Sequence, residues 1–305
     1  MLDNRRMDTR QLEYFVAVAE ELSFTRAAVR LFAAQSTVSA GVRSLENELG
    51  VQLFERSTKS VALSPAGAAM LPEAVHAIES LDRVRSSISK SNTEIRGRLR
   101  IGTFISLDVI ELPEVVGEYH RRHPLVDIQL VASSSGSTGL LEELRLGRLD
   151  VAFSGLPAQN SAQFHTTELV RSPFIAVLPE THPLAHRDAI QLRDLVSERW
   201  IDAPLGYASR RVLDQRFHAL GIERIISAET ADAGEIPRLV AAGLGVAVIP
   251  ELIYRPTSGA VIQPLRDAEL SFAIHVLLRA NPAPAAAAFL TLIKSRTYTE
   301  QTRTV

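Results

Sequence analysis

Residues 24–56 constrain the fold more than any other stretch of the chain, because their apolar residues follow two helical patterns separated by a short polar turn. The first pattern is formed by Ala27, Ala28 and Leu31. The second has apolar residues at helical spacings of four, three and four, namely Val38, Val42, Leu45 and Leu49. Two small alanines allow a second helix to cross the first closely. The stretch predicts a helix-turn-helix, although an ordinary helical hairpin has the same spacing.

The second predicted helix spans roughly residues 36–49 and ends at Gly50, a residue type common just past a helix C-terminus. Its short polar residues at 35–37 lie at the turn, where such side chains are expected to cap a helix. The pattern places six residues on the outward face: Gln35, Ser36, Thr37, Ser39, Ala40 and Arg43.

Two further elements flank this pair. A helix is expected from about Asp8 to Glu21, and Ser23 is expected to cap the helix that follows. The first of these helices has an inward face of Leu12, Phe15, Val16 and Ala19. Residues 52–63 predict a β-hairpin, because two short apolar ends surround a polar tip at residues 57–60. A solvated turn is the alternative for this tip.

A long helix is predicted to start at Ser64-Pro65 and to run to about Lys90. Its apolar residues recur at gaps of three and four and form a narrow seam of Leu71, Ala74, Ile78, Leu81, Val84 and Ile88. Such a seam is typical of association between helices of two chains, but packing against the helix's own domain would give the same periodicity. The polar stretch after it predicts a domain boundary near residues 91–96.

The N-terminal residues resemble the signature of LysR-type transcriptional regulators. The resemblance includes residues 7–24, the pattern from Ala27 to Arg56, and Leu63-Ser64-Pro65-Ala66-Gly67. It implies a winged helix-turn-helix DNA-binding domain at residues 1–64 and a dimerising linker helix at residues 65–92. It also implies a set of DNA-binding residues, which are Ser23, Gln35, Ser36, Thr37, Ser39, Ala40, Arg43, Arg56, Thr58 and Lys59.

The chain departs from the family pattern in its second helix. Ser36 follows the glutamine where proline is common, and Ala40 and Gly41 stand where larger polar residues are common. Few long side chains therefore remain to read base edges, and we expect the shape of the DNA to contribute to recognition. The first 64 residues contain eight Arg or Lys and eight Asp or Glu, so a single copy is expected to bind DNA weakly.

The composition of the chain limits the cellular compartments in which the protein is expected to act. The chain has 305 residues, a net charge of −2 and no cysteine, which excludes disulfides and thiol chemistry and fits the cytoplasm. Its N-terminal residues have no apolar segment of the signal-peptide kind, and no apolar run reaches membrane-spanning length, so we expect no membrane partner.

The C-terminal two-thirds alternates predicted strands and helices, which indicates a mostly parallel α/β sheet. Strands are expected at 98–103, 126–132, 149–154, 174–178, 200–202, 225–229, 245–249, 261–264 and 272–278. Helices are expected at 112–122, 139–146, 209–220, 235–242 and 284–294.

The layout of this part is similar to the effector-binding domain of the same family. The resemblance implies two Rossmann-like subdomains, akin to periplasmic binding proteins, within residues 97–297. The first would comprise about 97–168 and 270–297, and the second about 169–269. Two crossing strands would join the subdomains, and residues 298–305 would form a tail.

Four polar stretches, each between a strand and a helix, are expected to meet between the two subdomains. A helix N-terminus rich in hydroxyl groups suits an anion such as a carboxylate. Two acidic residues in these stretches suit an amine or a sugar hydroxyl instead. The candidate effector-binding residues are Thr103, Ser106, Ser135, Ser137, Asp202, Tyr207, Ser209 and Asp232, and helix capping is the alternative role for each.

Enzymatic functions are poorly supported. The chain has no Gly-x-Ser-x-Gly motif, and Gly243-Leu244-Gly245 follows a predicted helix, which is the wrong context for a dinucleotide site. His182 and His186 lie in a proline-bounded loop without a carboxylate cluster, so we expect no metal and no cofactor. The sequence predicts a regulator that binds a double-stranded operator and a small-molecule effector as a homodimer or homotetramer. A cytosolic binding protein or enzyme with a helical interaction module, or an architectural DNA binder without an effector, is the alternative.

Overall fold

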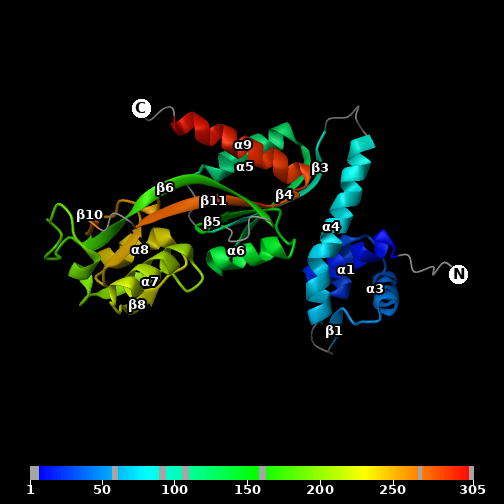
Figure 1. Cartoon of the computed structure of the whole chain (residues 1–305), viewed down its shortest axis with the longest axis horizontal. Helices are drawn as coiled ribbons and strands as arrows, with labels where there is room; N and C mark the ends of the chain where they lie inside the picture. Colours follow the sequence, from blue (N-terminus) through cyan, green and yellow to red (C-terminus); the bar gives the residue numbers. More distant parts are fainter. Residues whose placement is uncertain are drawn as a thin grey trace. The chain divides into compact units, whose positions relative to one another are not determined.

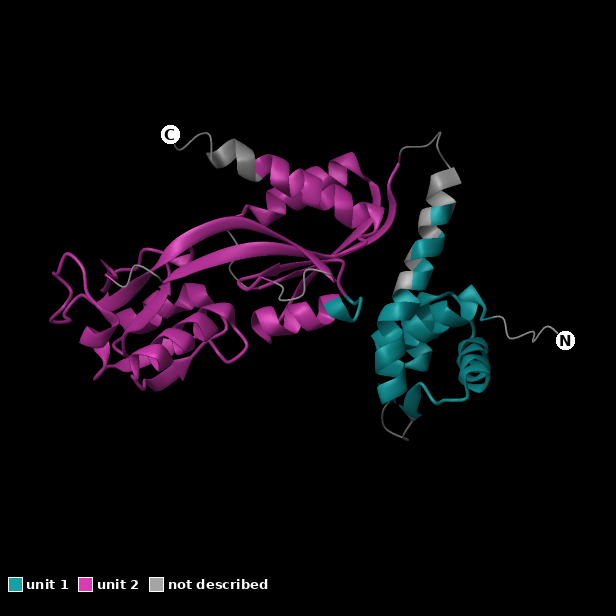
Figure 2. Cartoon of the chain, in the orientation of Figure 1, with its two compact units in different colours: residues 1–93, 145–148 teal, residues 94–144, 149–305 magenta. Residues whose placement is uncertain are grey.

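The computed structural model describes residues 7–56, 61–88, 94–104, 110–157, 163–266 and 270–301. The chain divides into two compact units, residues 1–93 with 145–148 and residues 94–144 with 149–305 (Figure 2). The division after Thr93 falls inside the stretch where the sequence predicts a domain boundary.

The first unit is a winged helix-turn-helix. Its elements are α1 (Thr9–Glu21), α2 (Phe24–Arg30), α3 (Gln35–Leu49), β1 (Phe54–Arg56), β2 (Val61–Leu63) and α4 (Pro65–Ile88). Local sequence sets the helix ends: Asp8 and Gln11 form a capping box at α1, and the Ser23 hydroxyl accepts a hydrogen bond from the Arg26 amide at α2. Gly50 closes α3 with φ of 69°.

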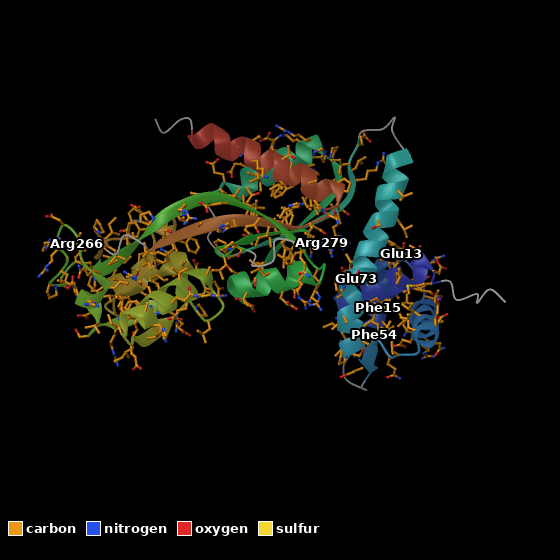
Figure 3. The ribbon with its side chains drawn as sticks, in the orientation of Figure 1. Glu13, Phe15, Phe54, Glu73, Arg266 and Arg279 are labelled. Atoms are coloured by element: carbon orange, nitrogen blue, oxygen red, sulfur yellow. The ribbon has the colours of Figure 1, made fainter. Side chains whose placement is uncertain are left out.

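The core of this unit lies where the helices meet the hairpin. The rings of Phe15 and Phe54 lie 5.5 Å apart between centroids, from α1 and β1 (Figure 3). Gly41 of α3 faces Tyr14 of α1 so closely that an added Cβ would lie 2.3 Å from the ring. The glycine therefore permits the two helices to pack together.

The second unit is an α/β domain. Its strands are β3 (Arg96–Thr103), β4 (Leu125–Ala132), β5 (Val151–Ser154), β6 (Phe164–Pro179), β7 (Arg199–Asp202), β8 (Ile225–Glu229), β9 (Ala247–Pro250), β10 (Ala260–Pro264) and β11 (Ser271–Arg279). Its α-helices are α5 (Leu112–Arg122), α6 (Gly136–Arg145), α7 (Ala208–Leu220), α8 (Ile236–Ala241) and α9 (Pro284–Gln301).

Strands β6 and β11 run antiparallel to each other through the whole domain and join its two lobes (Figure 1). The first lobe contains β3, β4 and β5 with α5, α6 and α9, and the second contains β7 to β10 with α7 and α8. Residues 164–173 of β6 pair with β11, and residues 174–179 pair with β9 and β10.

The prediction of a mostly parallel sheet is wrong, because the sheet is mixed. The order is β10-β6-β11-β5-β3-β4, with β9 also paired to β6. Strands β3, β4 and β5 are parallel, as are β7 and β8, but every pairing made by β6 or β11 is antiparallel.

Helices cover both faces of the first lobe. Helices α5 and α9 lie on one face (Figure 1), and Tyr119 and Phe289 are fully buried in the same apolar cluster as Phe153 of β5. Helix α6 covers the opposite face through Leu140 and Leu144. Alternate residues of the parallel strands therefore face two separate apolar clusters, as expected for an α/β layer.

Candidate nucleic-acid interface and effector site

The N-terminus of α3 differs in detail from the sequence prediction. Ala34 occupies the N-cap position, so no side chain caps the helix there, and the proposed capping role of Gln35, Ser36 and Thr37 is wrong. These three residues form the first turn of α3 and their side chains are exposed. They are thus open to solvent at the end of the helix that typically enters the major groove.

The rest of the predicted outward face is exposed, with one exception. Ala40 and Arg43 are exposed, whereas Ser39 is only 9% exposed and faces the interior beside Val38 and Val42. The placement of Ser39 on the outward face is therefore wrong. Arg43 makes no hydrogen bond or ion pair with any residue that the structure describes.

Basic residues on α2 are partly neutralised within the chain. Arg30 forms ion pairs with Glu20 and Glu21, the latter at 3.6 Å, and Arg26 lies 3.5 Å from Glu21. These pairs attach α2 to the end of α1. Arg43 is therefore the cation of this surface whose charge remains most open to a phosphate or a guanine.

The hairpin predicted as a wing is present. Phe54 pairs with Leu63 and Arg56 with Val61, which places Arg56 at the end of β1 next to the tip. The Glu46 carboxylate of α3 accepts hydrogen bonds from the backbone amides of Leu53 at 2.9 Å and of Phe54 at 3.3 Å, and so ties the wing to α3. Thr58 and Lys59 lie outside the described residues.

Helix α4 starts as predicted, because the Ser64 hydroxyl accepts a hydrogen bond from the Gly67 amide at 3.0 Å. Its seam divides into two parts. Leu71 and Ala74 are buried in the core of their own unit, with Ile78 packed at its edge, so the assignment of Leu71 and Ala74 to a seam between chains is wrong. Leu81 and Val84 are exposed, at 38% and 58%. The side chain of Ile88 lies outside the described part.

In the second unit the two lobes touch at the start of α6. The Thr138 amide and hydroxyl donate to the Gly206 carbonyl, at 3.3 Å and 3.2 Å. Gly136 and Gly206 both have positive φ. A Cβ on Gly136 would lie 2.9 Å from the carbonyl oxygen of Gly206 and 2.9 Å from the Cα atom of Tyr207. Glycine is thus required on the first lobe for this close approach. Sequence reasoning missed both Thr138 and Gly206, although positive φ favours glycine.

The predicted polar stretches converge here in part. The Ser133 amide donates to the Thr103 carbonyl at 3.0 Å, which joins the first two stretches. Ser135 is exposed, whereas Ser137 is buried and accepts a hydrogen bond from the Gly155 amide at 3.1 Å. Ser137 therefore links α6 to the end of β5. Ser106 lies outside the described residues.

Asp202 is engaged within the protein. It is 4% exposed, and its carboxylate accepts hydrogen bonds from Arg224 Nη1 at 2.6 Å and from the Ala203 amide at 2.7 Å. Arg210 lies 3.7 Å away, and both arginines also pair with Asp214. Burial raises the pKa of Asp202, and Arg224 opposes that rise. These internal partners favour a structural role for Asp202, and its contact with an effector stays a prediction.

Arg224 was missed by sequence reasoning, yet it organises the second lobe. Its guanidinium lies over the rings of Trp200 and Phe217, with 5.4 Å and 4.5 Å from Cζ to the ring centroids. Cation–π contact and the ion pair with Asp202 hold the same buried cation. The only signal in the sequence was a lone arginine between a helix and a strand.

Tyr207 has a different environment. Its side chain is 9% exposed, and its hydroxyl is buried without a hydrogen-bond partner among the described residues. Burial raises the pKa of the phenol, so the hydroxyl remains a neutral donor. Ser209 is half-buried nearby in α7, while Asp232 accepts a hydrogen bond from the Gly234 amide at 2.9 Å as a helix cap.

Comparison with known proteins decides the family. The model described as "Bacterial regulatory helix-turn-helix protein, lysR family" matches residues 9–68, and that of the "LysR substrate binding domain" matches residues 92–297. The chain belongs to the LysR family. It is a transcriptional regulator with a helix-turn-helix DNA-binding domain and an effector-binding domain, in a family whose members bind operators and small molecules and self-associate.

Similar LysR-family proteins include the regulator ShiR from Corynebacterium glutamicum, 38% identical over 79% of this chain and 82% of that protein. The Hca operon transcriptional activator HcaR from Escherichia coli is 33% identical over 84% and 88%. Among solved structures, a full-length OxyR variant from Pseudomonas aeruginosa has a TM-score of 0.76 and 26% identity, with 95% and 94% coverage. Full-length BenM has a TM-score of 0.58, 28% identity and 97% and 98% coverage.

These matches confirm the family, the fold class and the regulatory function that the sequence predicts. Among the described residues, no helix combines the length and apolar character needed to cross a membrane. No three potential ligands from His, Asp and Glu gather into a metal site within the same residues. Gly243 ends α8 with φ of 81°, as its interpretation as a helix C-terminal glycine requires.

Proposed function

We propose that this LysR-family regulator reads its operator with the exposed face of α3 and with the wing. The observation that carries the proposal is the exposure of Gln35, Ser36, Thr37 and Arg43 on one face of α3. Gln suits adenine and Arg suits guanine or phosphate, so Gln35 and Arg43 are the residues best able to discriminate bases. Ser23, at the N-cap of α2, and Arg56, at the end of β1, are proposed to contact the backbone.

Self-association is proposed to proceed through the distal half of α4. Leu81 and Val84 are exposed apolar residues one turn apart, and Ile88 continues their spacing. Two copies would place two α3 helices on one operator with dyad symmetry. They would also double the number of phosphate contacts available to a unit whose own charge is close to neutral. A dimer or a dimer of dimers is the proposed state.

We further propose that the effector binds between the two lobes of the second unit, against Tyr207. A buried hydroxyl without a partner is costly, and a ligand acceptor at that position would satisfy it. The first turn of α6 lies directly opposite, which favours a ligand that carries a carboxylate. Thr103, Ser106, Ser135, Ser137 and Ser209 are the hydroxyl residues proposed to surround it.

A ligand there would change the balance between open and closed lobes only as far as it binds the two states with different affinities. A thiol-based signal is excluded, since the chain contains no cysteine. We propose that the protein acts as a regulator and not as an enzyme, because its relatives are transcriptional regulators. As a DNA-binding regulator it is proposed to act in the cytoplasm.

The operator assignment is tested by footprinting the full-length protein on the DNA upstream of its own gene, at a stated salt concentration. We expect a protected region with dyad symmetry, and weaker protection by Arg43→Ala than by Arg193→Ala, an exposed arginine of the second unit. Equal protection by both variants would contradict the assigned surface. Absence of protection by the wild type at low salt would contradict the operator proposal.

The effector assignment is tested by thermal unfolding of the full chain with a panel of small carboxylic acids. An acid that raises the melting temperature of the wild type should have a smaller effect on Tyr207→Phe. Tyr254→Phe, which alters a half-buried tyrosine elsewhere in the second lobe, is the matched control. A shift of the same size in both variants would contradict the role of Tyr207.

A further inference from the structure

Phe32, in the turn between α2 and α3, is 99% exposed. The Phe32 amide donates to the Val29 carbonyl at 3.2 Å, and the Ala33 amide donates to the Ala28 carbonyl at 2.9 Å. These two hydrogen bonds define a Schellman motif that ends α2, with Phe32 at the position that takes a left-handed conformation. Its φ is accordingly 51°.

Phenylalanine is an unfavourable residue for this position. The left-handed conformation is unfavourable for a residue with a Cβ, and glycine avoids that cost. The chain uses glycine at the equivalent positions after α3 and α7, where Gly50 and Gly221 have φ of 69° and 67°. Phe32 gains no compensating burial within its own chain. A contact between the ring and another molecule would offset this cost.

The position of Phe32 indicates which molecule. Two residues separate it from the exposed first turn of α3, and Val29, one turn back on α2, is 72% exposed. In a helix-turn-helix the N-terminal end of the second helix lies against base edges, and the turn before it lies beside the groove. An apolar side chain in that location matches one feature of the major groove, the 5-methyl group of thymine.

The charge distribution of the first unit also favours an apolar contact between Phe32 and DNA. The guanidinium groups of Arg26 and Arg30 on α2 are already paired with Glu20 and Glu21. Ionic attraction from this side of the helix-turn-helix is thus weakened, and an apolar contact would add affinity that does not depend on salt. We propose that Phe32 packs against a thymine methyl group in each half-site and so contributes to operator specificity. The inference rests on the proposed DNA-binding function and names a further residue of that surface.

The experiment compares Phe32→Gly with wild type on synthetic duplexes of the DNA that the wild type protects. In these duplexes single thymines are replaced by deoxyuridine, which lacks only the methyl group. We expect wild-type affinity to fall at one thymine per half-site, and Phe32→Gly to bind the unmodified duplex on the order of tenfold more weakly. The variant should be insensitive to the same replacement, because it lacks the ring.

Stability separates this role from a structural one. Phe32→Gly should unfold at the same temperature as wild type or higher, since glycine suits the left-handed backbone. Leu22→Gly is the matched control: Leu22 also has positive φ and an exposed side chain, but it ends α1. Its operator affinity should equal that of the wild type.

Two results would overturn the proposal. One is an operator affinity of Phe32→Gly equal to that of the wild type. If such a variant also failed to activate transcription, the ring would be assigned to a contact with a protein partner. The other is wild-type binding that no thymine replacement changes. Failure of the wild type to protect any DNA would instead refute the proposed function itself, and this inference with it.

Discussion

Replacement of Arg224 by methionine tests the assignment of Asp202 to the structure of the second lobe. The substitution keeps much of the side-chain volume but removes the cation that pairs with Asp202 and lies over Trp200 and Phe217. We expect a large loss of stability in Arg224→Met, because the variant leaves a carboxylate that is 4% exposed without its main charged partner.

The expected magnitude follows from the two contacts. Removal of one partner of a buried ion pair typically costs about 3–5 kcal/mol, and the lost cation–π contacts contribute roughly another 0.5–2 kcal/mol. The pair with Asp214 adds little, since that side chain is 42% exposed. Asp202→Asn should cost about 1–3 kcal/mol. The double variant should lose less than the sum of the two single variants, because it removes both charges.

Urea unfolding of the full chain, followed by tryptophan fluorescence, measures these losses. Trp200 is the only tryptophan, so the signal reports the second lobe alone. Arg238→Met, which breaks an exposed pair with Glu235, is the matched control and should cost less than about 1 kcal/mol. A loss for Arg224→Met no larger than that of the control, or strict additivity with Asp202→Asn, would refute the reasoning.

Three further predictions concern other contacts. Burial lowers the pKa of His275, so the folded state favours the neutral ring and the stability of the protein falls as pH drops below the unfolded pKa of about 6.5. In urea titrations between about pH 7.5 and 5.5, His275→Gln should therefore lose less stability than the wild type. An equal dependence of stability on pH in both proteins would contradict this. In thermal unfolding, Gly136→Ala should lose about 1–3 kcal/mol more stability than the control Gly221→Ala, whose Cβ would meet no atom within 4 Å. An equal loss of stability in both variants would contradict the close approach of the lobes. Glu46→Ala should cost about 1–3 kcal/mol and weaken operator binding, with Glu46→Gln intermediate; unchanged stability would show that the wing does not depend on this carboxylate.

Sequence periodicity was sufficient wherever an element buries one continuous face. Helix α5 was predicted at its observed bounds, since Leu112, Val115 and Tyr119 repeat at helical spacing and are all buried. It was insufficient for β6. The pattern predicted residues 174–178, which are buried on both faces, but missed residues 164–173, where exposed polar residues alternate and the strand forms by pairing with β11.

The surroundings of the site residues were not visible in the sequence for a similar reason. Ser39 lies at the border between two faces of α3, where spacing does not decide whether a small polar residue points inward. Asp202 follows a strand, as an effector ligand would, but its main partner lies 22 residues further along the chain. Neither the burial of the carboxylate nor the choice of Arg224 is visible in local sequence, because both depend on the packing of α7 against β7.

Helix α4 has mechanical consequences for operator recognition. Its first half is fixed in the core by Leu71 and Ala74, while its second half carries the exposed Leu81 and Val84. At 24 residues it is roughly 36 Å long, so a change of about 10° in the crossing angle of two partner helices would move their far ends by about 6 Å. That displacement approaches two base-pair steps of the operator. In a dimer joined through Leu81 and Val84, as proposed, small rearrangements at the association surface would therefore change the spacing of the two DNA-reading helices.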